Sequence, residues 1–173
     1  MFKNDLDEGK VGEEIVKGFL EESGQFSSVR LIGSTLKKSK EHRDLQRKAG
    51  DIRCKRQDGS VVRFEVKRDK SANRTGNLFL ERYSDNGSRT GKKTIGWFCN
   101  DEAQYDYYAL VVVGKGTLFV KREELKDLVD TVKPRVLDMS YNQTQWNRSD
   151  GYIVKMTQVL SFCPSAKMVE GLY

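Results

Sequence analysis

The stretch 50-GDIRCKRQDGSVVRFEVKRDK-70 decides how this chain folds. Two runs of alternating residues flank Asp58-Gly59, and an Asp-Gly pair in that setting is a strong signal for a tight β-hairpin turn. Side chains alternate across a strand. One face of the second strand is therefore expected to carry Val62, Phe64 and Val66, and the other Arg63, Glu65 and Lys67.

The polar face of this hairpin combines two acids with a lysine. Glu65 and Lys67 have side-chain origins about 7 Å apart, at a rise of ~3.3 Å per residue, and Asp51 begins the neighbouring strand. Converging carboxylates suit Mg²⁺, which can polarise a phosphodiester and lower the pKa of a water. A lysine beside them can orient that water, or deprotonate it if its own pKa is lowered. The alternative, which the spacing alone favours, is a surface ladder of ion pairs contributing about 0.2–1 kcal/mol each.

Positive charge is concentrated in the middle of the chain. The 173 residues carry a net charge of +6, and residues 37–93 hold 18 Lys and Arg against 8 Asp and Glu. Such a concentration indicates a polyanionic partner, and nucleic acid is the expected one. The alternative is a basic, solvated face without a partner.

Cysteine and hydropathy patterns exclude other classes of protein. Cys54, Cys99 and Cys163 form no CxxC pair, and His42 is the single histidine, so a structural zinc site is not expected. Free thiols fit a reducing cytosol. The first ten residues lack the features of a signal peptide, and no apolar run approaches membrane-spanning length. We expect a cytoplasmic protein without a membrane partner, in the host cytoplasm if the gene is a phage's.

The remaining patterns predict an α/β or α+β domain with a mixed sheet. Residues 7–24 have helical periodicity, with Glu13 at the edge of the apolar face and Glu14 pointing to solvent. That apolar face consists of Val11, Ile15, Val16, Phe19 and Leu20. Further strands are expected over 26–33, 76–83, 105–114, 116–120 and 150–156. A helix is expected over 121–132, and a Gly-rich basic loop over 82–96. We expect one domain over 1–173, with a core of about 9–133 and a C-terminal extension, 134–173, packed on it or extending it.

With these elements in place, the chain resembles the PD-(D/E)XK nuclease superfamily, and most of all the archaeal-type Holliday-junction resolvases and related phage-type nucleases. The resemblance covers about residues 9–125. It rests on "GKVGEEIV" with Glu13, on "GD" with Asp51 in the PD position, and on "EVK" with Glu65 and Lys67. "DLQRKAGDI" followed by "FEVKRD" and "RTGNLFLE" is similar to a phage-type subset.

The resemblance implies a restriction-endonuclease-like core, DNA cleavage that depends on Mg²⁺ or Mn²⁺, and a homodimer. Asp51 and Glu65 would hold the metal, Glu13 would complete the site, and Lys67 would position the attacking water. The chain departs from the family pattern at Gly50, which replaces the proline. Its connection from helix to Asp51 is also longer than in the compact resolvases, which leaves the substrate geometry open.

Supporting residues and DNA contacts are expected around this site. Asn77 and Glu81 are predicted on one face of the strand adjacent to the hairpin, and they are weaker candidates for supporting residues, as are Gln46 and Ser34. Trp97 and Phe98 either stack on an unpaired base or, more typically, belong to the core. The predicted nucleic-acid-binding residues are Lys37, Lys38, Lys40, Arg43, Arg68, Lys70, Arg74, Asn77, Arg89, Lys92 and Lys93.

The predicted function is that of a Mg²⁺-dependent endonuclease that cleaves branched DNA, such as Holliday junctions, in recombination, repair or phage genome processing. A restriction-type enzyme is an alternative, although one short domain offers little apparatus for reading sequence. Two further alternatives are a catalytically silent nucleic-acid-binding relative and a basic structural protein.

Overall fold

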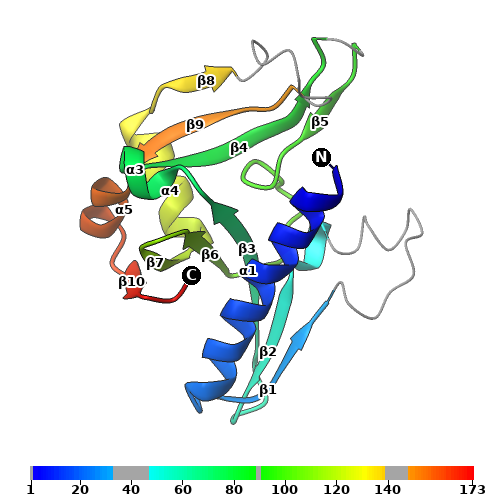
Figure 1. Ribbon diagram of the computed structural model, residues 1–173, viewed down its shortest axis with the longest axis vertical. Helices are drawn as coiled ribbons and strands as arrows, with labels where there is room; N and C mark the ends of the chain where they lie inside the picture. The colour runs from blue at the N-terminus through cyan, green and yellow to red at the C-terminus, as the bar shows by residue number, and fades with distance from the viewer. Residues whose placement is uncertain (1, 33–46, 89–90, 139–147) are drawn as a thin grey trace.

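The computed structural model describes residues 2–32, 47–88, 91–138 and 148–173, and these form two β-sheets with helices packed against them (Figure 1). The main sheet has the strand order β1 (Phe26–Leu31), β2 (Ile52–Arg56), β3 (Val61–Asp69), β6 (Tyr107–Val112), β7 (Gly116–Lys121), β10 (Lys167–Glu170). The second sheet has the order β5 (Lys93–Ile95), β4 (Asn77–Asn86), β9 (Asp150–Lys155), β8 (Val136–Asp138). The helices that lie wholly within the described residues are α1 (Phe2–Glu22), α3 (Ala72–Thr75), α4 (Arg122–Val132) and α5 (Met156–Phe162).

The expected α+β class with a mixed central sheet flanked by helices is confirmed. In the main sheet β3 and β6 run parallel, and the other pairs of neighbouring strands are antiparallel. The predicted hairpin is also confirmed, because β2 and β3 pair around a turn in which the Gly59 N–H donates to the Arg56 carbonyl at 3.0 Å.

Helix α1 covers one face of the main sheet. Its Val16 and Leu20 are buried in a cluster with Val66 and other apolar residues of β2, β3 and β6. The expected apolar face of this helix is therefore confirmed in its second half. Val11 does not belong to it, because 47% of its surface is exposed.

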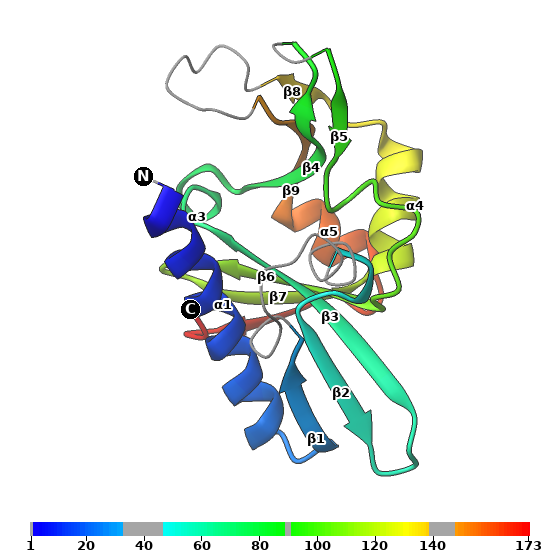
Figure 2. The same cartoon turned by 90° about the vertical axis from the view of Figure 1, so that its right-hand side faces the viewer.

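Helices α4 and α5 pack on the other side of the main sheet, together with one face of the second sheet (Figure 2). This larger cluster includes Leu118 of β7, Leu125 of α4, Val159 of α5 and Leu80 of β4. The second sheet is thus joined to the main sheet through a shared core.

The prediction that the strand after the hairpin lies beside it was wrong. Strand β4 pairs with β9 and β5 in the second sheet, because the parallel partner of β3 is β6. The expected basic loop over 82–96 is largely strand, since β4 continues to Asn86 and β5 returns antiparallel to it. Residues after Pro134 supply strands to both sheets, namely β8, β9 and β10.

Several expectations fall outside the described residues. These are the predictions for Ser34, Lys37, Lys38, Lys40, His42, Arg43, Gln46 and Arg89. The three cysteines are free thiols, as expected. None of the described helices is both long and apolar enough to cross a membrane.

Candidate functional site

The backbone conformation of Gly50 positions Asp51 in the site. Gly50 has φ +79°, and a Cβ there would lie 2.7 Å from the Phe64 carbonyl oxygen. Proline, whose φ is fixed near −65°, could not adopt this conformation. The Asp51 N–H donates to the Phe64 carbonyl at 2.8 Å, and the Asp51 carboxylate accepts the Val66 N–H at 2.8 Å. The backbone of β3 therefore orients the Asp51 carboxylate.

Glu65 and Lys67 form an ion pair on the predicted face of β3. Val62, Phe64 and Val66 are buried toward α1, which confirms the alternation. Lys67 Nζ lies 2.6 Å from Glu65 Oε1, and the two side chains are 35% and 8% exposed. This pair is not a solvated surface ladder, because its carboxylate is almost fully buried.

Helix α1 brings a third carboxylate to the same place. Burial and the facing Asp51 carboxylate raise the pKa of Glu13 to about 7. Burial also raises the pKa of Glu65 to about 7, with Lys67 opposing the shift and Asp51 adding to it. The structure thus brings together Glu13, Asp51, Glu65 and Lys67, as the sequence predicted.

Lys67 remains protonated in this setting. Burial works against its charge, but the Glu65 and Asp51 carboxylates outweigh burial and hold its pKa above the ordinary value. The role of a deprotonating base, which needs a lowered pKa, does not fit. A cation that attracts a water or a phosphate oxygen does.

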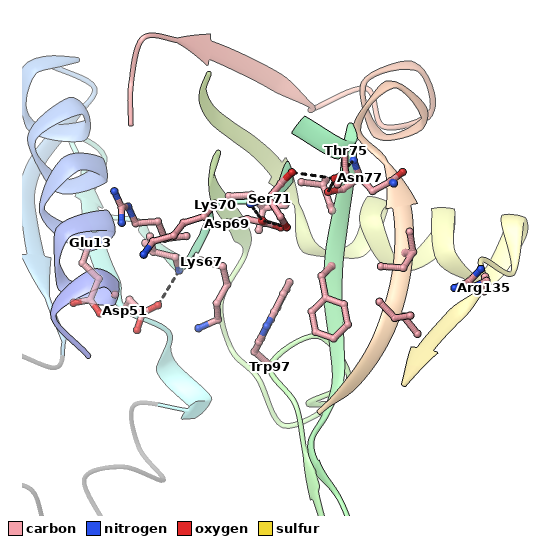
Figure 3. A pocket seen from close by; sticks show the side chains of 18 residues that line it. Glu13, Asp51, Lys67, Asp69, Lys70, Ser71, Thr75, Asn77, Trp97 and Arg135 are labelled. Atoms are coloured by element: carbon pink, nitrogen blue, oxygen red, sulfur yellow. Dashed lines mark hydrogen bonds between the residues drawn. The ribbon is translucent and has the colours of Figure 1, made fainter. Parts of the chain in front are cut away.

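Glu13, Asp51 and Lys67 line a cleft of about 910 Å³ between the two sheets, and Glu65 contacts it through its ion pair with Lys67. In Figure 3, Glu13 and Asp51 lie at one end, Arg135 at the other, and Lys67 and Trp97 between them. The lining residues are Gly9, Glu13, Asp51, Val66, Lys67, Arg68, Asp69, Lys70, Ser71, Thr75, Asn77, Leu78, Phe79, Trp97, Leu110, Arg135, Leu137 and Ile153.

The predicted nucleic-acid-binding residues divide between two places. Arg68, Lys70 and Asn77 line the cleft. Arg74 is exposed on α3, outside that lining. Lys92 and Lys93 lie where β5 begins, at the tip of the β4–β5 hairpin, and Lys93 Nζ stands 5.1 Å above the Tyr83 ring. The structure therefore does not place all these residues on one surface.

Sequence reasoning missed the contribution of the second sheet. Phe79, Ile153 and Arg135 line the cleft, and only the strand patterns of the first two were visible in the sequence. Trp97 packs against the core, as expected, and also lines the cleft. Glu81 is electrostatically coupled to Lys67, and its carboxylate accepts the Trp97 backbone N–H.

The carboxylates suit a divalent cation chemically. In the described part of the chain, no group of three or more Asp, Glu, His or Cys is arranged to hold a metal ion. Mg²⁺, however, is usually bound by only one or two carboxylates and keeps several waters. Asp51 and Glu65 meet that requirement, and a cation would relieve the repulsion that helps raise the pKa of Glu13 and of Glu65.

Comparison with known proteins gave no match among family models, curated proteins or solved structures.

Proposed function

We propose that this protein is a Mg²⁺-dependent nuclease that hydrolyses phosphodiester bonds in DNA. One observation carries the proposal, namely the carboxylates of Glu13, Asp51 and Glu65 around the cation of Lys67, beside a cleft that Glu13, Asp51 and Lys67 line. Buried acids that raise one another's pKa in a cleft are typical of functional sites rather than of surface ion pairs.

Each residue has a role in this proposal. Asp51 and Glu65 would hold Mg²⁺, with Glu13 completing the acidic site. A bound Mg²⁺ supplies charge neutralisation at the phosphodiester and a water of lowered pKa. Lys67, held as a cation by its carboxylate neighbours, positions the attacking water or a phosphate oxygen by charge-assisted hydrogen bonding.

The proposed substrate is branched DNA. Lys67, Arg68, Lys70 and Arg135 place positive charge along the cleft, which suits contacts with phosphates rather than with base edges. The resemblance to junction resolvases favours a branched substrate over a sequence-specific duplex site. The homodimer implied by that resemblance stays a prediction.

A cleavage assay tests the proposal. Labelled duplex, single strand, flap and four-way junction are incubated with wild type in Mg²⁺, Mn²⁺ or EDTA, and with Asp51→Asn and Lys67→Ala in Mg²⁺. We expect cleavage by wild type with metal only, best on a branched substrate, and a loss of at least about a hundredfold in either variant. DNA binding by the variants should persist.

Two controls make the result decisive. Lys167→Ala removes an exposed lysine of β10 that does not line the cleft, and it should cleave like wild type. Full cleavage by both Asp51→Asn and Lys67→Ala would refute the assigned site. Tight binding without any cleavage would indicate the catalytically silent relative instead.

A further inference from the structure

The cleft is larger than a single phosphate group requires, and beyond Lys67 its wall is apolar rather than charged. Its volume of about 910 Å³ falls within the ~300–1,000 Å³ typical of sites that enclose an organic ligand. The far wall is formed by the apolar side chains of Trp97, Phe79, Ile153 and Leu137, which we call the apolar wall. All four are partly exposed, so each presents surface to the cleft.

Side chains alternate across β4 in the second sheet, and this alternation points Phe79 toward the cleft. Leu78 and Leu80 of β4 are buried in the core shared with α4 and α5, which leaves Phe79 on the opposite face. Phe79 is paired with Ile153 across β4 and β9. A Cβ at Gly151 would lie 2.8 Å from the Phe79 ring, so the ring rests directly on the glycine backbone. Strand pairing and packing within the second sheet therefore hold the apolar wall in place.

Trp97 joins this wall to the catalytic end of the cleft. Its ring packs edge-on against buried Tyr108, with centroids 5.2 Å apart, and its backbone N–H donates to Glu81. Lys67 Nζ lies 5.9 Å from the centroid of the Trp97 ring. Successive nucleotides along one DNA strand are ~3.4 Å apart, so the distance from Lys67 Nζ to the Trp97 ring is shorter than two such steps. A nucleotide whose phosphate is held at Lys67 therefore has its base within reach of the ring.

We infer that the apolar wall is a binding subsite for an unpaired nucleobase next to the scissile phosphate. The inference rests on the proposed nuclease function and narrows its substrate to DNA with an unpaired nucleotide at the cleavage site. Cationic side chains of the same cleft, among them Arg68, Lys70 and Arg135, complement the phosphates that flank such a base. A base inside a duplex is covered by its stacked neighbours, whereas an unpaired base can stack on an aromatic ring.

Three DNA duplexes test this subsite. The first carries one unpaired thymidine, the second an abasic residue at the same bulge, and the third is fully paired. Kd values are measured with the full chain in Ca²⁺, and cleavage rates in Mg²⁺. We expect wild type to prefer the unpaired thymidine over the abasic residue by about 5- to 150-fold in Kd, the range for one stacked base.

Variants of the apolar wall supply the decisive comparison. Trp97→Leu and Phe79→Leu should each reduce that preference at least threefold while leaving the Kd for the abasic duplex unchanged, and Trp97→Tyr should keep it. Phe162→Leu is the matched control, because Phe162 is an exposed phenylalanine of α5 outside the cleft lining. Thermal unfolding checks each variant, and Phe79→Leu carries the test if Trp97→Leu does not fold.

The outcomes separate the subsite from the nuclease. Equal Kd values for thymidine and abasic duplexes, with cleavage intact, would overturn the subsite and leave the nuclease standing. A thymidine preference lost in the wall variants, without cleavage of any substrate, would support the subsite and overturn the nuclease. Failure to bind any of the three duplexes would overturn both.

Discussion

Gly50 is the residue on which the position of Asp51 depends. Its φ of +79° and the 2.7 Å approach of a Cβ to the Phe64 carbonyl make any side chain there both strained and crowded. We predict that Gly50→Ala lowers the free energy of unfolding by about 2–4 kcal/mol, from the cost of the left-handed conformation plus the clash. Urea denaturation measures this loss.

Gly24 provides the matched control for that substitution. It also has a positive φ, +66°, but a Cβ there would meet nothing within 4 Å. Gly24→Ala should therefore cost only the conformational part, about 1–2 kcal/mol. Equal losses in the two variants would show that the close approach at Gly50 is unimportant.

Glu13 is half-buried beside Asp51, whereas its neighbour Glu14 is exposed. The pH dependence of stability therefore tests whether Glu13 belongs to the acidic site. The folded pKa of Glu13 is raised from 4.5 to about 7, so between these values the unfolded chain loses its proton first. Stability of the metal-free protein should therefore fall as pH rises from about 4.5 to about 7, and then level off. Glu13→Gln removes this penalty, and we predict a gain of about 1–2 kcal/mol at pH 8 in EDTA.

Glu14→Gln is the control for Glu13→Gln, because Glu14 is exposed to solvent on the same turn of α1. It should change the free energy of unfolding by less than about 0.5 kcal/mol at either pH. Urea denaturation at pH 5 and pH 8 measures both variants. A Glu13→Gln protein with no gain at pH 8 would mean that neither burial nor the Asp51 carboxylate disfavours the charged form of Glu13.

At the residue scale, sequence spacing could predict which side chains meet but not their protonation. Alternation along β3 placed Glu65 and Lys67 on one face, and the helical pattern placed Glu13 at the edge of α1. The pKa of Lys67 depends on how many carboxylates surround it in three dimensions. The spacing along β3 reveals only one of them, that of Glu65.

At the element scale, local patterns predicted strands but not all of their partners. The β2–β3 and β6–β7 hairpins follow from turns between alternating runs, so their pairing is local. The alternation of β4 shows that one face is buried, yet it is equally compatible with pairing to β3 or to β9. Its partner β9 begins 64 positions after β4 ends, and no local signal connects them.

The pairing of β4 with β9 is reinforced by a part-buried ion pair that can be tested. Arg82 Nε and an amino group of its guanidinium each lie 2.9 Å from an oxygen of Asp150, whose side chain is 8% exposed. We predict that Asp150→Asn lowers the free energy of unfolding by about 1–3 kcal/mol, because it leaves Arg82, whose side chain is 34% exposed, without its bidentate partner.

An exposed ion pair serves as the comparison for Asp150→Asn. Lys48 and Glu102 approach to 2.7 Å, but their side chains are 46% and 70% exposed. Glu102→Gln should therefore cost less than about 1 kcal/mol. If thermal unfolding shows the two substitutions to be equivalent, burial of Asp150 does not strengthen its pair.

At the scale of the whole molecule, the cleft exists because the chain leaves the main sheet after β3 and builds a second sheet from β4 onward. Helix α1 supplies Glu13, the main sheet with the residue before β2 supplies Asp51, Glu65 and Lys67, and the second sheet supplies the opposite wall, including residues that follow Pro134. Sequence reasoning could treat that C-terminal segment only as an extension. Its contribution to the cleft depends on contacts between distant strands, which composition and periodicity do not encode.

Arg135 tests whether the C-terminal segment takes part in binding. It is exposed at the end of the cleft opposite Glu13 and Asp51, while its backbone carbonyl accepts the Ile153 N–H (Figure 3). Arg135→Ala keeps that backbone bond and removes the charge. We predict a Kd for DNA raised by roughly fivefold at low salt, and a salt dependence of log Kd that is smaller by about one unit, as for one lost phosphate contact.

Lys167→Ala removes the same charge from the exposed face of β10, away from the cleft lining. Because long-range attraction by the net charge would be weakened equally by both variants, only a contact within the cleft makes Arg135→Ala the more damaging. Titrations of both proteins with the same labelled junction at several salt concentrations decide between these cases. Identical slopes would mean that DNA reaches the carboxylates without spanning the cleft to the second sheet.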